Sequence, residues 1–204
     1  MHNDSRTMIS RRRFAAGFAL GSVALALPFP VLAMTVADAR GMIDKAVAEI
    51  NTTIASGKSE TAMYGDFERI FSRYADVPVI ARSALGVAAK KASAGQLTAF
   101  TKAFQGYISR KYGSRFREFI GGQIEVVDAK PVKSYYEVIT VAKLKGQSPF
   151  DLRWHVSDKS GRLLFFNIII EGVNMLASER TEIGAILDKN KGDIDALIAA
   201  IKAA

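Results

Sequence analysis

Two adjacent segments decide the fold: FDLRWHVS at residues 150–157 and LLFFNIII at residues 163–170. In the first segment apolar side chains alternate with polar ones, which predicts a strand that buries one face. The second segment is almost wholly apolar, so we expect a strand that is covered on both faces. Residues 157–161 read SDKSG, a run of turn-forming residues that predicts a hairpin between the two strands.

Two further strands are expected upstream, at residues 124–127 and 135–144. With the first two segments they predict a four-stranded antiparallel meander, which Gly172 is expected to end. The polar positions of residues 150–157 are expected to face solvent, and His155 is one of them.

Helical patterns precede and follow this sheet, because apolar residues there recur at three- and four-residue steps. Asp76 stands as a cap before Pro78, and Ser93 with Gln96 forms a capping-box pattern. The expected helices cover residues 36–54, a stretch from Met63 to Tyr74, 78–85, a long segment from Ser93 to the Gly121–Gly122 pair, 175–187 and 194–201. Helices, a meander and helices again indicate an α+β fold with helices packed on one antiparallel sheet.

The residue content excludes several kinds of chemistry. The chain has no cysteine, which rules out disulfides, thiolate metal sites, a cysteine nucleophile and a lipoprotein anchor. Its two histidines, His2 and His155, are too few for a multi-histidine metal site. No nucleophile elbow, phosphate-binding glycine loop or zinc-protease motif is present. We therefore expect no enzyme activity, no cofactor and no metal.

The chain is mildly basic, with a formal charge of +8, of which the first 33 residues contribute +3. No basic stripe with interleaved aromatic residues is present, so no nucleic-acid partner is expected. The excess charge suits peripheral contact with an anionic membrane surface. Four basic residues near the end of the long helix could dock an acidic partner: Arg110, Lys111, Arg115 and Arg117.

The first 33 residues have the pattern of an export signal. Ser10, Arg11, Arg12, Arg13 and Phe14 match the twin-arginine motif S-R-R-x-F. The apolar run that follows is about fourteen residues long, short of the roughly 20 that a spanning helix needs. Cleavage is expected after Ala33, at the sequence Val-Leu-Ala. The sequence thus predicts a signal peptide over residues 1–33, a periplasmic domain over residues 34–204, and, as the alternative, an uncleaved anchor.

Several short motifs resemble the MlaC family, also called toluene-tolerance proteins. Leu85-Gly86 followed by Ser93, Gln96, Phe100 and Phe104 is similar to the opening of that family's long helix. Residues 167–175, NIIIEGVNM, resemble its D-V-x-I-E-G-V-S-L segment, with Asn167 in place of the aspartate. Arg180, Leu187, Gly192 and Leu197 fall where the family has the same residue types. The likeness covers about Val36 to Ile201.

The resemblance implies a cone-shaped fold related to nuclear transport factor 2 (NTF2-like) with extra helices, enclosing an apolar cavity. It also implies a carrier that passes phospholipid between an outer-membrane lipoprotein or porin complex and an inner-membrane ABC transporter, which maintains the lipid asymmetry of the envelope. Composition by itself favours a solid core for the many aromatic residues. A hopanoid cargo stays open within the same family.

If the cavity exists, its walls are predicted from the strand phase and the helical stripes. The sheet wall would comprise Leu152, Trp154, Leu164, Phe166, Ile168 and Ile170, unless the phase is shifted by one residue. The helical wall would comprise Phe67, Ile70, Phe71, Phe100, Phe104, Tyr107 and Ile108.

Two other functions compete with the carrier. One is an isomerase on a similar cone, with Glu171 as the base beside Tyr136 or Tyr107. Glu171 more often would pair with an arginine such as Arg180. The other is an interaction module of the envelope that binds no lipid.

Overall fold

The computed structural model describes residues 34–113 and 118–204. The export motif of Arg11, Arg12 and Phe14 and the cleavage site after Ala33 lie outside the described residues, as do Arg115 and Arg117. The elements in chain order are α1 (Val36–Ile54), α2 (Glu60–Tyr74), α3 (Val77–Leu85), the 3₁₀ helix η1 (Gly86–Lys90), α4 (Ala94–Gly113), β1 (Gln123–Val132), β2 (Tyr135–Lys143), β3 (Phe150–Ser157), β4 (Leu164–Ile170), β5 (Val173–Asn174), α5 (Met175–Lys189) and α6 (Ile194–Ala203).

The strands form one antiparallel sheet in the order β1-β2-β3-β4-β5. The sheet therefore has five strands, and the prediction of four was wrong. Glu171 and Gly172 both have positive φ angles, 49° and 81°, as a two-residue hairpin turn requires. The chain folds back at this turn instead of leaving the sheet, and Val173 pairs with Ile170.

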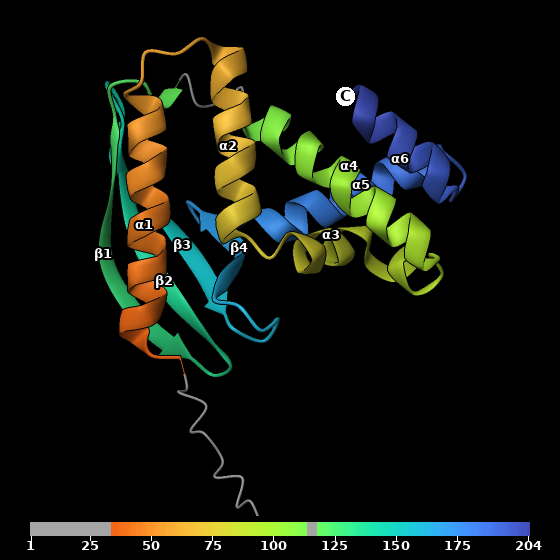
Figure 1. Cartoon of the computed structure of the whole chain (residues 1–204), viewed down its shortest axis with the longest axis horizontal. Helices are drawn as coiled ribbons and strands as arrows, with labels where there is room; N and C mark the ends of the chain where they lie inside the picture. Colours follow the sequence, from red (N-terminus) through yellow and green to blue (C-terminus); the bar gives the residue numbers. More distant parts are fainter. Residues whose placement is uncertain (1–33, 114–117) are drawn as a thin grey trace, which may run out of the picture. The chain divides into compact units, whose positions relative to one another are not determined.

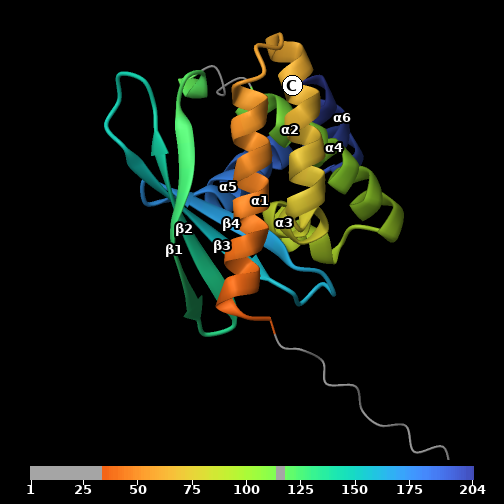
Figure 2. The same ribbon diagram turned by 60° about the vertical axis from the view of Figure 1, so that its left-hand side comes forward.

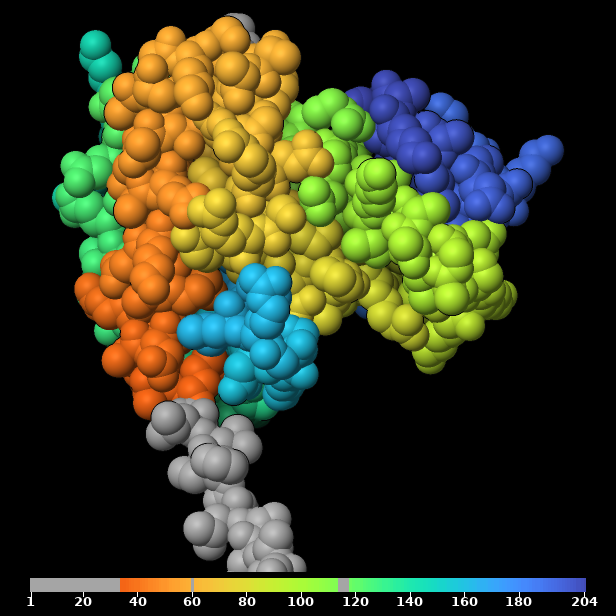
Figure 3. All heavy atoms as spheres, viewed as in Figure 1, coloured from red at the N-terminus to blue at the C-terminus, as the bar shows by residue number. Residues whose placement is uncertain are grey.

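Helix α1 crosses one face of the sheet, and α2 packs on α1 on the side away from β1 (Figures 1 and 2). A capping box between Thr35 and Asp38 begins α1. The Asn51 side chain both donates to and accepts from the backbone of Ile124, which fastens α1 to the edge strand β1. In Figure 3 the atoms of α1 and α2 are in contact along their length.

The remaining helices form a second group beside α2 (Figure 1). Helix α4 packs on α2, α3 and α6, while α5 packs on α3 and β4. Arg110 on α4 donates hydrogen bonds to the backbone carbonyls of Ile201, Lys202 and Ala204. It thereby supplies partners for carbonyl groups at the C-terminal end of α6 that have none within the helix. Within residues 34–113 and 118–204 none of the helices has the length and hydrophobicity of a membrane span.

Two element boundaries differ from the sequence prediction. The α-helix α4 ends at Gly113, and Phe119 lies beyond it, with its ring edge-on against Phe150. Strand β1 continues to Val132, well past the predicted end at residue 127. It tolerates Pro131 because an edge strand has one side that needs no ladder hydrogen bonds.

A β-bulge lies in the centre of the sheet. Strands β3 and β4 pair Trp154 with Ile168 and His155 with Asn167, but the register then shifts and Val156 pairs with Phe165. The extra residue is Phe166. A bulge of one residue reverses the alternation of faces beyond it, so the strand phase of β4 changes at this point.

Candidate functional site

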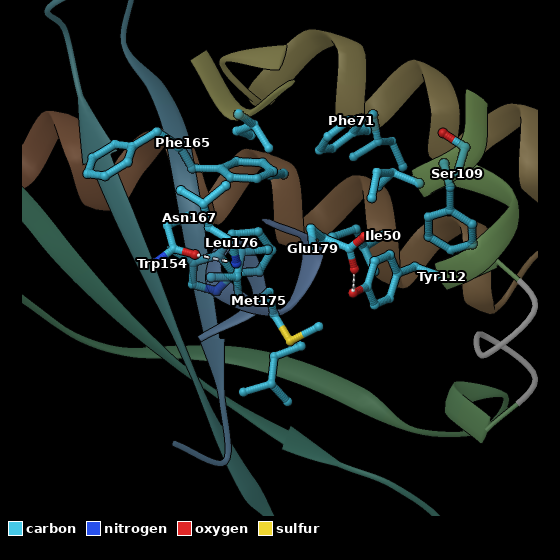
Figure 4. A pocket seen from close by; sticks show the side chains of 18 of the residues that line it. Ile50, Phe71, Ser109, Tyr112, Trp154, Phe165, Asn167, Met175, Leu176 and Glu179 are labelled. Carbon is cyan, nitrogen blue, oxygen red and sulfur yellow. Dashed lines mark hydrogen bonds between the residues drawn. The ribbon is translucent and has the colours of Figure 1, made fainter. Parts of the chain in front are cut away.

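An almost wholly apolar pocket of about 180 Å³ lies between the helices and the sheet. Helices α1, α2, α3, α4 and α5 and strands β3 and β4 supply its walls (Figure 4). The lining residues are Ala46, Ile50, Phe67, Ile70, Phe71, Ile80, Ile108, Ser109, Tyr112, Gly113, Trp154, Phe165, Phe166, Asn167, Ile168, Ile170, Met175, Leu176 and Glu179.

The helical wall comes from residues at helical spacing. Phe67, Ile70 and Phe71 lie on one face of α2, and Ile108 and Tyr112 lie one turn apart on α4. Gly113 follows them at the end of α4. A methyl group at this glycine would come within 2.6 Å of the Tyr64 ring, so the close approach of α2 requires glycine.

The sheet wall comes from the inner face of β3 and β4. Trp154 is buried, and its indole N–H donates to Thr140 Oγ1 at 3.0 Å. Ile168 and Ile170 follow on the same face of β4. The bulge then brings Phe165 to this face, where its ring meets the Trp154 ring edge-on at a centroid distance of 5.1 Å.

Eight of the predicted wall residues line this pocket and five do not. Those that line it are Phe67, Ile70, Phe71, Ile108, Trp154, Phe166, Ile168 and Ile170. Those that do not are Phe100, Phe104, Tyr107, Leu152 and Leu164.

Phe100 and Phe104 are fully buried in the core of the helical group, with their rings tilted against each other at a centroid distance of 5.7 Å. Tyr107 follows on the same helix and points its hydroxyl at Glu182 on α5. Leu152 is buried on the inner face of the sheet, where it pairs with Ile170. Leu164 pairs with Ser157 on the opposite face, because the bulge reverses the phase.

Phe166 borders the pocket, but its ring lies near those of Tyr135 and His155, on the other face of the sheet. The expectation that His155 faces solvent was wrong, since only 9% of its surface is exposed. Its Nε2 lies 3.6 Å from Glu137. Burial lowers the pKa of His155, and the neighbouring carboxylate opposes this shift only in part.

Sequence reasoning missed the contribution of α5. Met175, Leu176 and Glu179 come from the first turns of this helix, whose direction depends on the β4–β5 turn. Asn167 helps to position it, because its Oδ1 accepts a hydrogen bond from the backbone N–H of Leu176 at 3.1 Å. An aspartate at this position could accept the same bond.

A polar cluster adjoins the pocket between α4 and α5. Glu179 accepts hydrogen bonds from the Tyr112 hydroxyl and from Lys111 Nζ, the latter at 2.7 Å. Lys111 also pairs with Glu182, to which Tyr107 donates. These residues form the α4–α5 cluster: Tyr107, Lys111, Tyr112, Glu179 and Glu182.

The pKa values of Tyr107, Tyr112 and Lys111 are raised in this cluster. Burial, and then the hydrogen bond to Glu182, raise the pKa of Tyr107 to about 12. Burial and the bond to Glu179 raise the pKa of Tyr112 further still. Burial by itself would lower the pKa of Lys111, but its bonds to Glu179 and Glu182 outweigh this effect and raise it to about 12.

The suggested basic docking surface is not supported by the two of its residues that the structure describes. Lys111 is engaged by two carboxylates, and Arg110 is engaged by the end of α6. Both side chains are therefore already bonded to other groups of the chain.

The residues of the isomerase alternative do not converge. Glu171 lies exposed in the β4–β5 turn, whereas Tyr136 donates to the carbonyl of Met34 and Tyr107 to Glu182. The guanidinium of Arg180 lies beside Gly86. No group of three or more histidine, aspartate or glutamate side chains in the described part of the chain could hold a metal ion.

The family model described as MlaC protein matches residues 40–203. The chain belongs to the MlaC family. Its fold is also similar to that of a phospholipid-binding protein from Ralstonia solanacearum, solved in complex with a phospholipid. The two chains share 15% sequence identity at a TM-score of 0.69, over 81% of this chain and 95% of the other. At this identity the likeness establishes the MlaC-type α+β fold.

Proposed function

We propose that this MlaC-family protein is a periplasmic carrier that holds the acyl chains of a phospholipid in its apolar pocket. The observation that carries the proposal is the lining: nearly all of it is aliphatic or aromatic, from five helices and two strands. The structurally similar Ralstonia protein binds a phospholipid, which agrees with this use of the fold.

The energetics suit a carrier rather than a permanent store. Burial of one methylene group is worth about 0.8 kcal/mol, so two chains of roughly sixteen carbons amount to on the order of 25 kcal/mol. A pocket as apolar as the bilayer interior buries the acyl chains almost as favourably as the membrane does, and it adds few specific bonds. Lipid can then be extracted from one membrane and released to another.

The pocket has to widen for this cargo. Its volume of about 180 Å³ lies below the roughly 300–1,000 Å³ of typical ligand sites. Seven lining side chains are only half-buried, and those without a hydrogen-bonding group can move outward most readily: Phe71, Phe166, Ile168, Ile170, Met175 and Leu176, with Tyr112 as the seventh. We infer that α5 and the adjoining edge of the sheet move away from α2 as the acyl chains enter.

The proposed cellular role follows the family. The carrier would receive or deliver lipid at an outer-membrane lipoprotein or porin complex and at an inner-membrane ABC transporter, and so maintain lipid asymmetry. Export would use the twin-arginine signal of residues 1–33, and the periplasmic protein is then expected to begin at Met34. Intact mass measurement of the protein from a periplasmic extract tests this expectation, and a mass that includes residues 1–33 would contradict cleavage.

Lipid transfer between vesicles tests the function itself. Donor vesicles carry a fluorescent phospholipid with a quencher, acceptor vesicles carry neither, and the purified protein is added to both. The carrier is expected to raise the transfer rate in proportion to its concentration. A rate equal to that of spontaneous transfer at every protein concentration would refute the carrier. A cargo other than phospholipid, such as a hopanoid, would appear on organic extraction of the protein.

A further inference from the structure

Glu179 is a buried carboxylate in the wall of an apolar pocket. Only 4% of its side chain is exposed, although glutamate is almost never buried so deeply without partners. Its Oε1 is occupied by Tyr112 and Lys111. Its Oε2 is buried and has no hydrogen-bond partner within residues 34–113 and 118–204. Figure 4 shows the carboxylate beside Tyr112, among the apolar side chains of the pocket.

An unpaired buried acceptor is costly, and such groups usually have a partner. Glu179 is one of the residues that line the pocket, so its carboxylate adjoins the space that a ligand would fill. Ser109 and Asn167, the other uncharged polar side chains of the lining apart from Tyr112, both bond to protein atoms: the Ser109 hydroxyl to the Gln105 carbonyl and Asn167 to Leu176. The unsatisfied acceptor therefore distinguishes Glu179 among the lining groups.

The charge of the α4–α5 cluster favours a cationic donor over a neutral one. Its charged members are Glu179, Glu182 and Lys111, so one ammonium group is shared by two carboxylates. These three described side chains together carry one net negative charge beside an apolar space. Charge-assisted hydrogen bonds are stronger than neutral ones, and low polarity strengthens them further.

We propose that Glu179 binds the primary ammonium group of an aminophospholipid through its free carboxylate oxygen. This inference rests on the proposed function and adds a headgroup preference to it. The acyl chains lie along the apolar walls of α2, β3 and β4, and the headgroup lies at the α4–α5 end. Lipids whose nitrogen bears three methyl groups have no donor for Oε2 and bind more weakly.

A matched lipid pair tests the preference. Phosphatidylethanolamine and phosphatidylcholine with identical acyl chains have the same net charge and differ in the N–H donors of the headgroup. The protein is incubated with vesicles that contain both lipids in equal amounts, re-isolated and analysed by native mass spectrometry. We expect about tenfold more phosphatidylethanolamine than phosphatidylcholine on the wild-type chain, the effect of one charge-assisted bond.

Two variants on the same helix separate Glu179 from a general charge effect. Glu179→Gln keeps the side-chain size and removes the charge, so the lipid ratio should fall to near one. Asp188→Asn makes the same charge change at an exposed position of α5 and should keep the ratio. Circular dichroism establishes that both variants are folded.

The outcomes distinguish the headgroup proposal from the carrier proposal. Equal loading of the two lipids on the wild type, or an unchanged preference in Glu179→Gln, overturns the headgroup proposal and leaves the carrier intact. If the wild type takes up neither lipid, the carrier proposal fails, and the role of Glu179 fails with it.

Discussion

Replacement of Ile168 by aspartate is expected to abolish lipid binding while the fold persists. Ile168 lies on the inner face of β4, opposite Trp154, and its side chain lines the pocket. It is only half-buried, so a carboxylate there can remain hydrated while the pocket holds no lipid. When acyl chains enter, this carboxylate would lose its water without gaining a partner.

The magnitude follows from two contributions. Loss of the buried isoleucine surface removes about 1.5–3 kcal/mol of apolar contact with the lipid. Desolvation of an unpaired carboxylate adds a further cost of roughly 2 kcal/mol or more. The sum, at least about 3 kcal/mol, corresponds to more than a 100-fold loss of affinity.

The neighbouring residue supplies the control. Ile169 lies on the opposite face of β4, beside Arg153, and does not line the pocket. Ile169→Asp therefore makes the same chemical change on the same strand and should leave the affinity within about twofold. Lipid affinity is measured by titration with vesicles, and urea denaturation compares the stability of the two variants. Equal loss of binding in both variants, or none in either, would refute the assignment of faces.

Three further outcomes follow from the structure. Phe104→Ala should lower the free energy of unfolding by about 3–5 kcal/mol in urea denaturation, because its side chain is fully buried in the core; a loss below about 1 kcal/mol would contradict this. Gly172→Ala should cost about 1 kcal/mol or more, since φ is 81° there, and unchanged stability would argue against the tight β4–β5 turn. The lowered pKa of His155 means that the unfolded chain takes up its proton first as the pH falls. Stability should therefore decline as the pH drops below about 6.5, and His155→Gln should flatten the decline; identical pH profiles would exclude this role.

Local sequence patterns predicted the helices and strands well, because the formation of a helix or strand depends largely on residues that are close in the sequence. Helix α1 and strand β3 have the bounds that their periodicity predicts, and Asp76 caps α3 as expected. The fifth strand was missed because glycine after a strand was interpreted as its end. The turn becomes a hairpin because Glu171 has a positive φ angle in addition to Gly172.

The candidate site was harder to predict because it depends on long-range geometry. Strict alternation placed Leu164 in the wall, and the bulge at Phe166 removes it and brings in Phe165. The aromatic stripe of α4 was assigned to the wall, yet Phe100 and Phe104 pack inside the helical group. The packing of whole helices and strands decides which side of a helix meets which neighbour. Periodicity alone does not predict this choice.

The α4–α5 cluster could not have been predicted from spacing. Lys111 and Glu179 are 68 residues apart, and each by itself has the pattern of an exposed helical charge. Their pairing depends on how α5 leaves the sheet after the β4–β5 turn. The buried carboxylate that supports the headgroup proposal became visible only with the folded chain.

The fluorescence of Trp154 offers the most direct test of the central claim, that acyl chains enter this pocket. Trp154 is the only tryptophan of the chain, and its buried ring lines the pocket. Bromine atoms on an acyl chain quench tryptophan only on near contact. Phospholipid with brominated chains should quench most of the emission, whereas the same lipid without bromine should not. Unquenched emission from protein that native mass spectrometry shows to be loaded with the brominated lipid would contradict the account.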